Sequence, residues 1–354
     1  YLQRFDGIDQ DAYEATAIMY RLIDEFGLRT APAVLFENVK IDGNVIKGPI
    51  VANMQGPLHA EALLLGATAY PDDPRETYRS ATAVMLSRLE ANDGQWPLIP
   101  PREVEAADAP VKAIIARGDD IDVTDFAFIK GNPGDGGRYI NTASVFTRDP
   151  DMGVNLGTYR CQIKGPRKIM INFEEGQTGK KMADAALARG ETRMDITLVG
   201  GQDPITWMVS SSRIPSRIGN NKPIDELAVA GGFRGKAVDV VRTEDGAFLV
   251  PAHAEMIIEG TVSITETLIE GPYGEWAGYH FPGKKMPKPR QDVTCVTFRD
   301  NAIHPTCVPA VPPNSTVNFI AMCQSNDSVI ALKKAGFPII DGLQTFETAG
   351  HWFV

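Results

Sequence analysis

Short β-like runs fill the middle of this chain, and they constrain its fold more than any other feature of the sequence. They occupy residues 139–146, 157–163, 169–173, 195–199, 237–242, 256–259 and 293–298. Glycine, asparagine and aspartate turns separate them, and one helix over 180–188 interrupts them. Short strands spaced by such turns are typical of antiparallel sheets. The spacing therefore predicts a mostly antiparallel sheet or barrel over this region.

The first hundred residues show a different pattern, in which helical periodicity alternates with short β-like runs. Residues 11–26 place apolar side chains at helical spacing, and Gly27 follows as a stop. Two β-like runs, 33–36 and 48–54, come next. Two helices then begin at Pro57 and Pro74, and the second ends near residue 90. We interpret this segment as an α/β unit.

Composition marks the expected domain limits. Residues 93–110 contain prolines at 97, 100, 101 and 110, which indicates an extended strap and a boundary. After the β-rich region, a helix is expected over 327–335 and a strand over 350–354. We therefore expect a mixed α+β and α/β fold: an N-terminal α/β domain over 1–110, a central domain over 111–310 and the beginning of a C-terminal α/β domain over 311–354. Because that last part closes on a strand with no following element, we expect it to be incomplete.

Charge and cysteine use exclude several classes of protein. The chain has 354 residues, with 45 acidic and 35 basic side chains and a formal net charge of -10. A protein that binds the nucleic-acid backbone needs a net basic face, so we expect no nucleic-acid partner. The four cysteines and five histidines do not fall at metal-ligand spacings, and the sequence shows no signal segment or long apolar run. These features predict a soluble protein of the reducing cytoplasm with no membrane partner.

The densest group of candidate catalytic residues is Glu-Gly-Pro-Tyr-Gly-Glu at 270–275, which sets two carboxylates five residues apart on a turn. Such a turn can direct Glu270 and Glu275 into one pocket, and two neighbouring acids raise the pKa of one of them, which suits a general acid. The alternative is a solvated acidic turn. Upstream, Glu255 and Glu259 share one face of a strand, and we expect that face to be a solvated edge.

A second group, Asn155 to Arg160, places an amide, a glycine and a guanidinium within one expected strand. Arginine donors hold phosphate or carboxylate, and an asparagine oxygen can bind a hard cation. An exposed strand with an ordinary ion pair explains the same residues equally well. Residues 132–138 form a glycine-rich loop that could bind an anion, but a plain hairpin connection is favoured. Ser210, Ser211 and Ser212 lack the Gly-x-Ser-x-Gly pattern of a nucleophile.

Together these stretches resemble the UbiD-like decarboxylase family, which uses prenylated FMN and includes ferulic, cinnamic and other aromatic acid decarboxylases. The resemblance is carried by residues 250–260, which contain Pro-Ala-His-Ala-Glu, and by 270–279. It extends to residues 135–140, 155–160 and 336–354. The resemblance implies that the central region is an antiparallel split β-barrel that binds the flavin.

The same resemblance implies a catalytic trio. It assigns Arg160 to orient and polarise the substrate carboxylate, Glu275 to deliver the proton that replaces carbon dioxide, and Glu270 to tune both. The implied reaction is a reversible, non-oxidative decarboxylation of an aromatic, heteroaromatic or α,β-unsaturated carboxylic acid. Loss of CO2 leaves an electron pair on carbon that no side chain accepts well, so a cofactor such as prenylated FMN is needed.

The family holds the flavin phosphate through a divalent ion, typically Mn2+, with K+ nearby. By register, Asn155 and Glu226 match two of its metal ligands. Thr178 stands where the family has a histidine, so the hydroxyl could coordinate, water could fill the gap, or the divalent site is weaker or rearranged. Glu174 and Glu175 could supply a substitute carboxylate or a polar pocket wall, or form a solvated loop. The implied cofactor contacts are Asn155, Leu156, Gly157, Thr158, Tyr159, Arg160, Gln177, Thr178 and Glu226.

Substrate and partners are implied in less detail. The positions that resemble the family's substrate pocket are Thr142, Trp276, Thr316 and Ile320. The bulk of Trp276 favours a flat aromatic or heteroaromatic acid. A flavin prenyltransferase would supply the cofactor, and a homodimer or homohexamer, possibly with other subunits, is expected. Two alternatives remain: a carboxylase-complex or non-catalytic assembly subunit of the same fold, and, with less support, a flavoprotein reductase.

Overall fold

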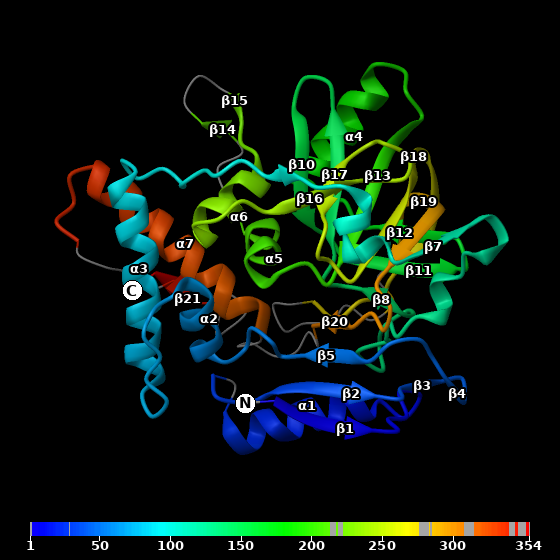
Figure 1. The fold of residues 1–354 in the computed structure, drawn as a ribbon, viewed down its shortest axis with the longest axis horizontal. Coiled ribbons are helices and arrows are strands. Elements are labelled where there is room, and N and C mark those ends of the chain that lie inside the picture. Colours follow the sequence, from blue (N-terminus) through cyan, green and yellow to red (C-terminus); the bar gives the residue numbers. More distant parts are fainter. Residues whose placement is uncertain are drawn as a thin grey trace.

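A computed structural model describes residues 2–27, 29–212, 217–218, 222–275, 283, 285–307, 315–339, 344–345 and 352–353. A large antiparallel sheet lies beside a small, mostly N-terminal sheet (Figure 1). A group of helices lies at the left of this view, away from most strands of the large sheet. The mixed α/β architecture predicted from the sequence is thus confirmed. None of the helices in the described ranges is both long and apolar enough to cross a bilayer.

The small sheet joins three strands from the N-terminal part of the chain to one strand that follows the large sheet. Its strand order is β1-β2-β5-β20, with bounds Leu2–Asp6, Ala33–Glu37, Ile50–Ala52 and His304–Thr306. Helix α1, Glu14–Phe26, packs Met19 and Leu22 against this sheet, and Gly27 ends the helix at a φ of 76°, which favours glycine. A hairpin of β3, Lys40–Ile41, and β4, Asn44–Val45, follows β2. The predicted first helix and both early strands are confirmed.

The large sheet has nine strands, and all of its pairings are antiparallel. Its order is β10-β9-β13-β18-β19-β12-β11-β8, and β7 pairs with β19. Irregular register at two points of the β18–β19 pair bends these long strands. Because the described end strands β10 and β8 do not pair with each other, the sheet is open, as in a split barrel. The bounds are Ile114–Arg117 (β7), Tyr139–Ile140 (β8), Ser144–Asp149 (β9), Gly153–Thr158 (β10), Cys161–Gly165 (β11), Lys168–Ile171 (β12), Arg193–Gly200 (β13), Met256–Glu270 (β18) and Met286–Phe298 (β19).

Three helices border this sheet, although the sequence predicted only α4, Thr178–Ala188. The two that the sequence analysis missed are α5, Pro204–Ser211, and α6, Glu226–Arg234. Helix α5 has only eight residues and is largely buried, so it shows no strong polar face. Helix α6 contains two glycines, which weaken the helical signal. Each has an aspartate N-cap, Asp203 and Asp225, which was the available sequence signal.

A third group of helices, α2 (Leu58–Leu65), α3 (Pro74–Ala91) and α7 (Ser315–Lys334), packs beside α5 and α6 (Figure 1). The proline-rich strap runs from α3 across α6, where the N–H of Ile99 donates to the carbonyl of Ala228 at 2.9 Å. The strap then forms β6, Arg102–Glu103, which pairs in parallel with β16, Asp239–Arg242, next to β17, Leu249–Pro251. The remaining strand pairs are β14, Arg217–Ile218, with β15, Lys222–Pro223, and β21, Gln344–Thr345, with β22, Trp352–Phe353.

The largest apolar core joins all three expected domains. It contains Met85 from α3, Phe146 from β9, Phe233 from α6 and Ile330 from α7. A second core fills the interior of the large sheet, and a third lies under α1. The domain limits at residues 110 and 310 therefore remain a prediction from composition, while packing is continuous across them.

One buried acid, Glu61, lies among these helices. The Glu61 side chain on α2 is fully buried, and neither carboxyl oxygen has a hydrogen-bond partner in the part of the chain that is described. Burial raises the pKa of Glu61 well above its ordinary value of 4.5. The folded chain therefore holds this proton at pH values where the unfolded chain releases it.

We expect Glu61→Met to stabilise the protein at pH 8. Because the folded pKa is raised, the wild-type chain is destabilised progressively as pH rises above about 4.5 and through the folded pKa. Removing the acid should increase the free energy of unfolding by roughly 1–3 kcal/mol at pH 8 and flatten this part of the pH profile. Denaturant unfolding at several pH values measures it. The exposed Glu25 provides the control: Glu25→Gln should leave the profile unchanged, and an identical slope in Glu61→Met would contradict the interpretation.

Candidate active site

The candidate site forms where β10 ends and β11 begins. Strand β10 stops at Thr158 and β11 starts at Cys161, so Arg160 lies in the junction between two strands. The predicted single strand over residues 155–160 is therefore wrong. The junction allows the Arg160 side chain to reach the end of β18, more than a hundred residues further along the chain.

Arg160 contacts both glutamates of the acidic loop. Its Nε and Nη2 donate to the two carboxylate oxygens of Glu270 at 2.9 and 3.1 Å, and its Nη1 donates to Glu275 Oε1 at 2.6 Å. The side chains of Arg160, Glu270 and Glu275 are 11%, 2% and 19% exposed. Burial lowers the pKa of Arg160, but hydrogen bonding to Glu270 and the two negative charges outweigh it and raise the pKa overall. The guanidinium is therefore permanently charged, and the solvated acidic turn is excluded.

Loop 132–138 holds the acidic loop in place. Its Asp135 accepts the N–H of Gly274 at 2.8 Å, and the N–H of Gly136 donates to the carbonyl of Pro272 at 2.7 Å. A Cβ on Gly136 would lie 2.2 Å from the Gly271 carbonyl oxygen, so this close approach requires glycine. Ile129 and Tyr139 form an antiparallel bridge around the loop, as expected for a hairpin connection. The connection therefore has the additional role of positioning the acidic loop.

Two tyrosines complete the network, and the sequence analysis gave neither a role. Tyr139 donates its O–H to Glu270 Oε1 at 3.0 Å, and the Tyr273 ring lies 5.1 Å from the Arg160 guanidinium carbon. The two rings are 4.5 Å apart. Burial is the main cause that raises the pKa of both hydroxyls, so both remain hydrogen-bond donors. Both residues stand inside the quoted motifs, which was the signal that could have identified them.

The expected cofactor residues gather next to this network, around Tyr159. Asn155 is buried, and its Nδ2 donates to Thr147 Oγ1 at 3.2 Å and to the Tyr159 hydroxyl at 3.3 Å. The same hydroxyl accepts the N–H of Gly179 at 3.1 Å. Because both amide hydrogens of Asn155 are used, its oxygen is the atom left for a ligand. Gly179 belongs to α4 and shares the Tyr159 hydroxyl with Asn155. The start of α4, with Gln177 as N-cap and Thr178 as first residue, therefore lies beside Asn155.

Glu226 also lies next to β10. It is the first residue of α6, is half-buried, and contacts the backbone N–H of Leu156. Burial raises the pKa of Glu226 to about 8. Thus one predicted metal ligand, Asn155, lies on β10, and the other, Glu226, contacts the backbone of the next residue of that strand. The described residues contain no group of three or more His, Cys, Asp or Glu side chains placed to hold a metal.

Hydroxyl groups line the next part of β10. Thr158 Oγ1 lies 2.9 Å from Ser210 Oγ and 3.1 Å from Ser211 Oγ at the end of α5. Their sequence lacks the pattern of a nucleophile and gives no sign of this contact. Leu156, by contrast, buries its side chain in the main core, so only its backbone faces the expected cofactor residues. Glu174 Oε1 lies 3.9 Å from Arg160 Nη1, and Glu175 pairs with Lys180 at 3.3 Å.

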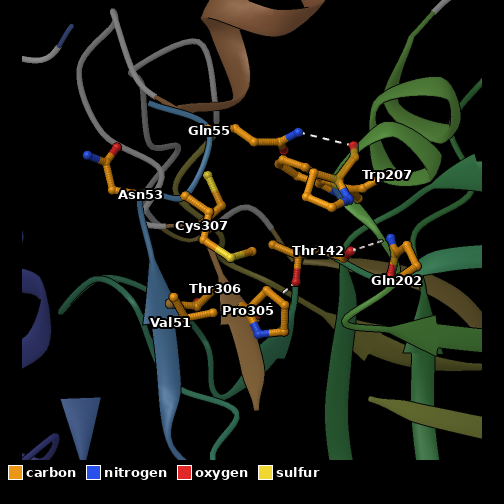
Figure 2. Close-up of a pocket in the computed structure, with 11 residues that line it drawn as sticks. Val51, Asn53, Gln55, Thr142, Gln202, Trp207, Pro305, Thr306 and Cys307 are labelled. Atoms are coloured by element: carbon orange, nitrogen blue, oxygen red, sulfur yellow. Dashed lines mark hydrogen bonds between the residues drawn. The ribbon is translucent and has the colours of Figure 1, made fainter. Parts of the chain in front are cut away.

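The expected substrate residues are only partly described. Thr142 is buried and donates to the Pro305 carbonyl at 2.7 Å at the edge of a small pocket (Figure 2). Thr316 and Ile320 belong to α7, of which only the backbone is described at these positions, and Trp276 lies outside the described residues.

The expected solvated edge was wrong for Glu259. This residue is fully buried and accepts the N–H groups of Glu244 and Asp245 at 3.0 and 3.1 Å. The alternation of side chains along a strand shows which residues share a face. It does not show whether another element of the fold covers that face.

Comparison with known proteins identifies the family of this chain. The family model described as the 3-octaprenyl-4-hydroxybenzoate carboxy-lyase Rift-related domain (UbiD) matches residues 102–312. The chain belongs to the UbiD family. Its matched region includes both strands that flank Arg160 and the whole acidic loop.

Curated relatives are longer than this chain. It is 28% identical over 285 residues to ferulic acid decarboxylase 1 of Saccharomyces cerevisiae, covering 80% of this chain and 54% of the relative. It is 28% identical over 340 residues to pyrrole-2-carboxylic acid decarboxylase of Pseudomonas aeruginosa, covering 92% of this chain and 63% of that one. The chain therefore spans less than two thirds of the length of these UbiD relatives.

Solved structures share the fold. Vanillic acid decarboxylase of Sedimentibacter hydroxybenzoicus in its open form matches with a TM-score of 0.83 at 23% identity, covering 98% of this chain and 69% of the other. The UbiD-class enzyme HmfF of Pelotomaculum thermopropionicum, in complex with prFMN, matches with a TM-score of 0.79 at 24% identity, covering 98% and 73%. The large antiparallel sheet with its flanking helices is thus a UbiD-class fold.

We expect Arg160→Met to destabilise the chain strongly, because it leaves Glu270 buried without its cation. The free energy of unfolding should fall by about 3–5 kcal/mol, and adding Glu270→Gln should recover part of the loss. Urea unfolding of the single and double variants measures this coupling. The control is Arg79→Met, which breaks a pair with 59% and 46% exposed side chains and should change little. Equal losses in the two arginine variants would contradict the assigned burial of the network.

Proposed function

We propose that this protein is a reversible, non-oxidative decarboxylase of an aromatic, heteroaromatic or α,β-unsaturated carboxylic acid that uses prenylated FMN. The observation that carries the proposal is the Arg160 guanidinium, charged and shared between Glu270 and Glu275. Curated relatives named as decarboxylases of ferulic, phenolic and pyrrole-2-carboxylic acids support the reaction class. An HmfF structure in complex with prFMN supports the cofactor.

Arg160 is proposed to bind and polarise the substrate carboxylate. A guanidinium has five N–H donors, and three of them are engaged by Glu270 and Glu275 in the described residues. The remaining donors suit a planar carboxylate. Because Glu270 accepts two N–H groups along one edge of the guanidinium and is itself held by Tyr139, the orientation of Arg160 is fixed before substrate binds.

Glu275 is proposed to deliver the proton that replaces CO2. It is the more exposed of the two glutamates, at 19% against 2%, so it is the one within reach of a ligand. Its contact with Arg160 keeps it close to the carboxylate that leaves. Glu270, enclosed by Arg160 and Tyr139, is proposed to tune the charge of the network and not to transfer the proton itself.

The residues around Asn155 fit a flavin phosphate bound through a divalent ion. The Asn155 oxygen, the Glu226 carboxylate and the Thr178 hydroxyl are oxygen donors of the kind that Mn2+ or Mg2+ and K+ accept. When bound, prenylated FMN supplies the electron sink that decarboxylation requires. We propose that Gln177 and the backbone of residues 155–160 contact this cofactor, with Thr178 as a weaker ligand than the usual histidine.

The substrate and the assembly are proposed from the same family resemblance. We propose a small planar carboxylic acid as substrate, with Thr142, Trp276, Thr316 and Ile320 in its pocket, and a flavin prenyltransferase as cofactor source. A homodimer or homohexamer is proposed, possibly with other subunits. The alternative is a carboxylase-complex or assembly subunit without bound cofactor, which the replacement of histidine by Thr178 favours.

The catalytic roles are tested by turnover. The chain is co-expressed with a flavin prenyltransferase, purified without oxygen, and assayed for CO2 release from a panel of aryl and acrylic acids. Because the proton donor is lost, Glu275→Gln should reduce turnover by about 10²–10⁴-fold while the cofactor spectrum is retained. The matched control Glu266→Gln changes an exposed glutamate and should remain active. Full activity in Glu275→Gln would place the proton donor elsewhere, and absence of bound flavin would favour the assembly subunit.

The metal ligands are tested by stability. Mn2+ binding to the folded chain should raise its melting temperature, and saturation at 100 times the dissociation constant corresponds to about 2.7 kcal/mol. We expect Glu226→Gln to abolish the shift and Thr178→His to tighten Mn2+ binding roughly tenfold, because imidazole is a better ligand than a hydroxyl. Thermal melts across a Mn2+ titration measure both. Identical Mn2+ curves for the wild type and both variants would exclude this site.

A further inference from the structure

A third carboxylate, Glu174, lies beside the Arg160 guanidinium, and the proposed mechanism gives it no role. Its Oε1 is 3.9 Å from Arg160 Nη1, the nitrogen that donates to Glu275. That separation is too long for a hydrogen bond, so the two side chains form an ion pair. The Glu174 side chain is 50% exposed, whereas those of Glu270 and Glu275 are 2% and 19% exposed. Of these three carboxylates, Glu174 is therefore the most accessible to a small molecule.

The loop that carries Glu174 joins β12 to α4 and is held on both sides of this residue. On the N-terminal side, the Asn172 N–H donates to the Arg160 carbonyl at 3.2 Å, and Asn172 Nδ2 donates to Glu174 Oε1 at 3.0 Å. On the C-terminal side, the Gln177 N–H donates to the Glu174 carbonyl at 3.1 Å, and Gln177 Oε1 accepts the Glu174 N–H at 2.9 Å. The loop itself therefore sets the position of the Glu174 carboxylate next to Arg160.

Glu174 adds negative charge at the place where the substrate carboxylate is proposed to bind. A carboxylate oxygen that accepts a hydrogen bond of about 2.8 Å from Arg160 Nη1 would lie at most about 7 Å from Glu174 Oε1. Arg160 is already paired with Glu270 and Glu275, so its single positive charge is shared before the substrate arrives. Two carboxylates at this separation in a partly buried site repel each other. A carboxylic acid therefore binds here less favourably unless another group relieves that repulsion.

A hydrogen-bond donor on the substrate relieves the repulsion if it lies between the two carboxylates. An N–H or O–H group at the position next to the carboxylate-bearing carbon is close enough to a carboxylate bound to Arg160 to reach Glu174 as well. A donor on the opposite side of a ring points away from Glu174. Hydrogen bonds to a charged acceptor are about twice as strong as those between neutral groups. Glu174 therefore favours a donor at the adjacent position over one elsewhere on the ring.

We propose that Glu174 is a specificity-determining residue that selects carboxylic acids with an N–H or O–H donor at the position next to the carboxylate-bearing carbon. The proposal rests on the function proposed above, in which Arg160 binds the substrate carboxylate. An acid with this donor pairs with Arg160 and Glu174 together. An acid without it meets the Glu174 charge unrelieved, and a penalty of this kind against the wrong ligand is one way in which proteins achieve specificity.

The test compares two acids of nearly the same shape, pyrrole-2-carboxylate and furan-2-carboxylate. The first has an N–H at the position next to the carboxylate-bearing carbon, and the second has a ring oxygen there. Dissociation constants are measured by calorimetry on the protein saturated with FMN, which lacks the prenyl group and supports no turnover under the proposed mechanism. Pyrrole-2-carboxylate should bind at least about tenfold more tightly, as expected for one hydrogen bond to a charged acceptor. Equal affinities would overturn the proposal.

Two variants separate the charge of Glu174 from its capacity to accept a hydrogen bond. Glu174→Gln removes the charge and keeps an acceptor, so it should tighten furan-2-carboxylate binding about threefold and retain part of the preference. Glu174→Met removes both, so the preference for pyrrole-2-carboxylate should disappear. The matched control is Glu175→Met, which changes the neighbouring glutamate, 87% exposed and paired with Lys180, and should alter neither affinity. An unchanged preference in Glu174→Met, or an equal loss of preference in Glu175→Met, would overturn the proposal.

The same measurements distinguish failure of this inference from failure of the proposed function. If neither acid binds, the proposed role of Arg160 and the selection by Glu174 are both wrong. If both acids bind equally and the Glu174 variants change neither affinity, only the selection by Glu174 is wrong. Because affinity is measured without turnover, absence of decarboxylation would leave the binding result unaffected. In the enzyme with prenylated FMN, the preference should appear in KM and not in kcat, since Glu174 contacts the side of the substrate and not the reacting carbon.

Discussion

The guanidinium of Arg160 is the interaction on which the rest of the site depends. Glu270 is 2% exposed, and a carboxylate buried to that degree needs an opposite charge close by. Arg160 supplies it through two N–H groups and uses a third to hold Glu275, so one cation sets the positions of both acids. Tyr139 fills the next acceptor position of Glu270, and Asp135 fixes the backbone of the loop that carries the pair. The charges of the network are therefore held in place by the fold itself.

The large sheet explains how residues so far apart in sequence meet. Strand β18 ends at Glu270, and its partner β19 pairs in turn with β12 and, through it, with β11. Arg160 directly precedes β11, so the register of three antiparallel pairings determines where its side chain emerges. A one-residue slip would turn every side chain of a strand to the opposite face. The continuous apolar core behind β13 and β18 prevents such a slip.

Local patterns predicted those parts of the fold in which one element determines its own structure. The helical spacing ahead of Gly27 and the proline at the start of α3 were sufficient for α1 and α3. Helix α5 was missed because it is buried on most sides, and burial of Glu259 was missed because strand periodicity does not show what covers a face. The grouping of Arg160, Glu270 and Glu275 came from family resemblance. Tyr139 and Tyr273 required three-dimensional contacts, since a tyrosine is equally common in an ordinary core.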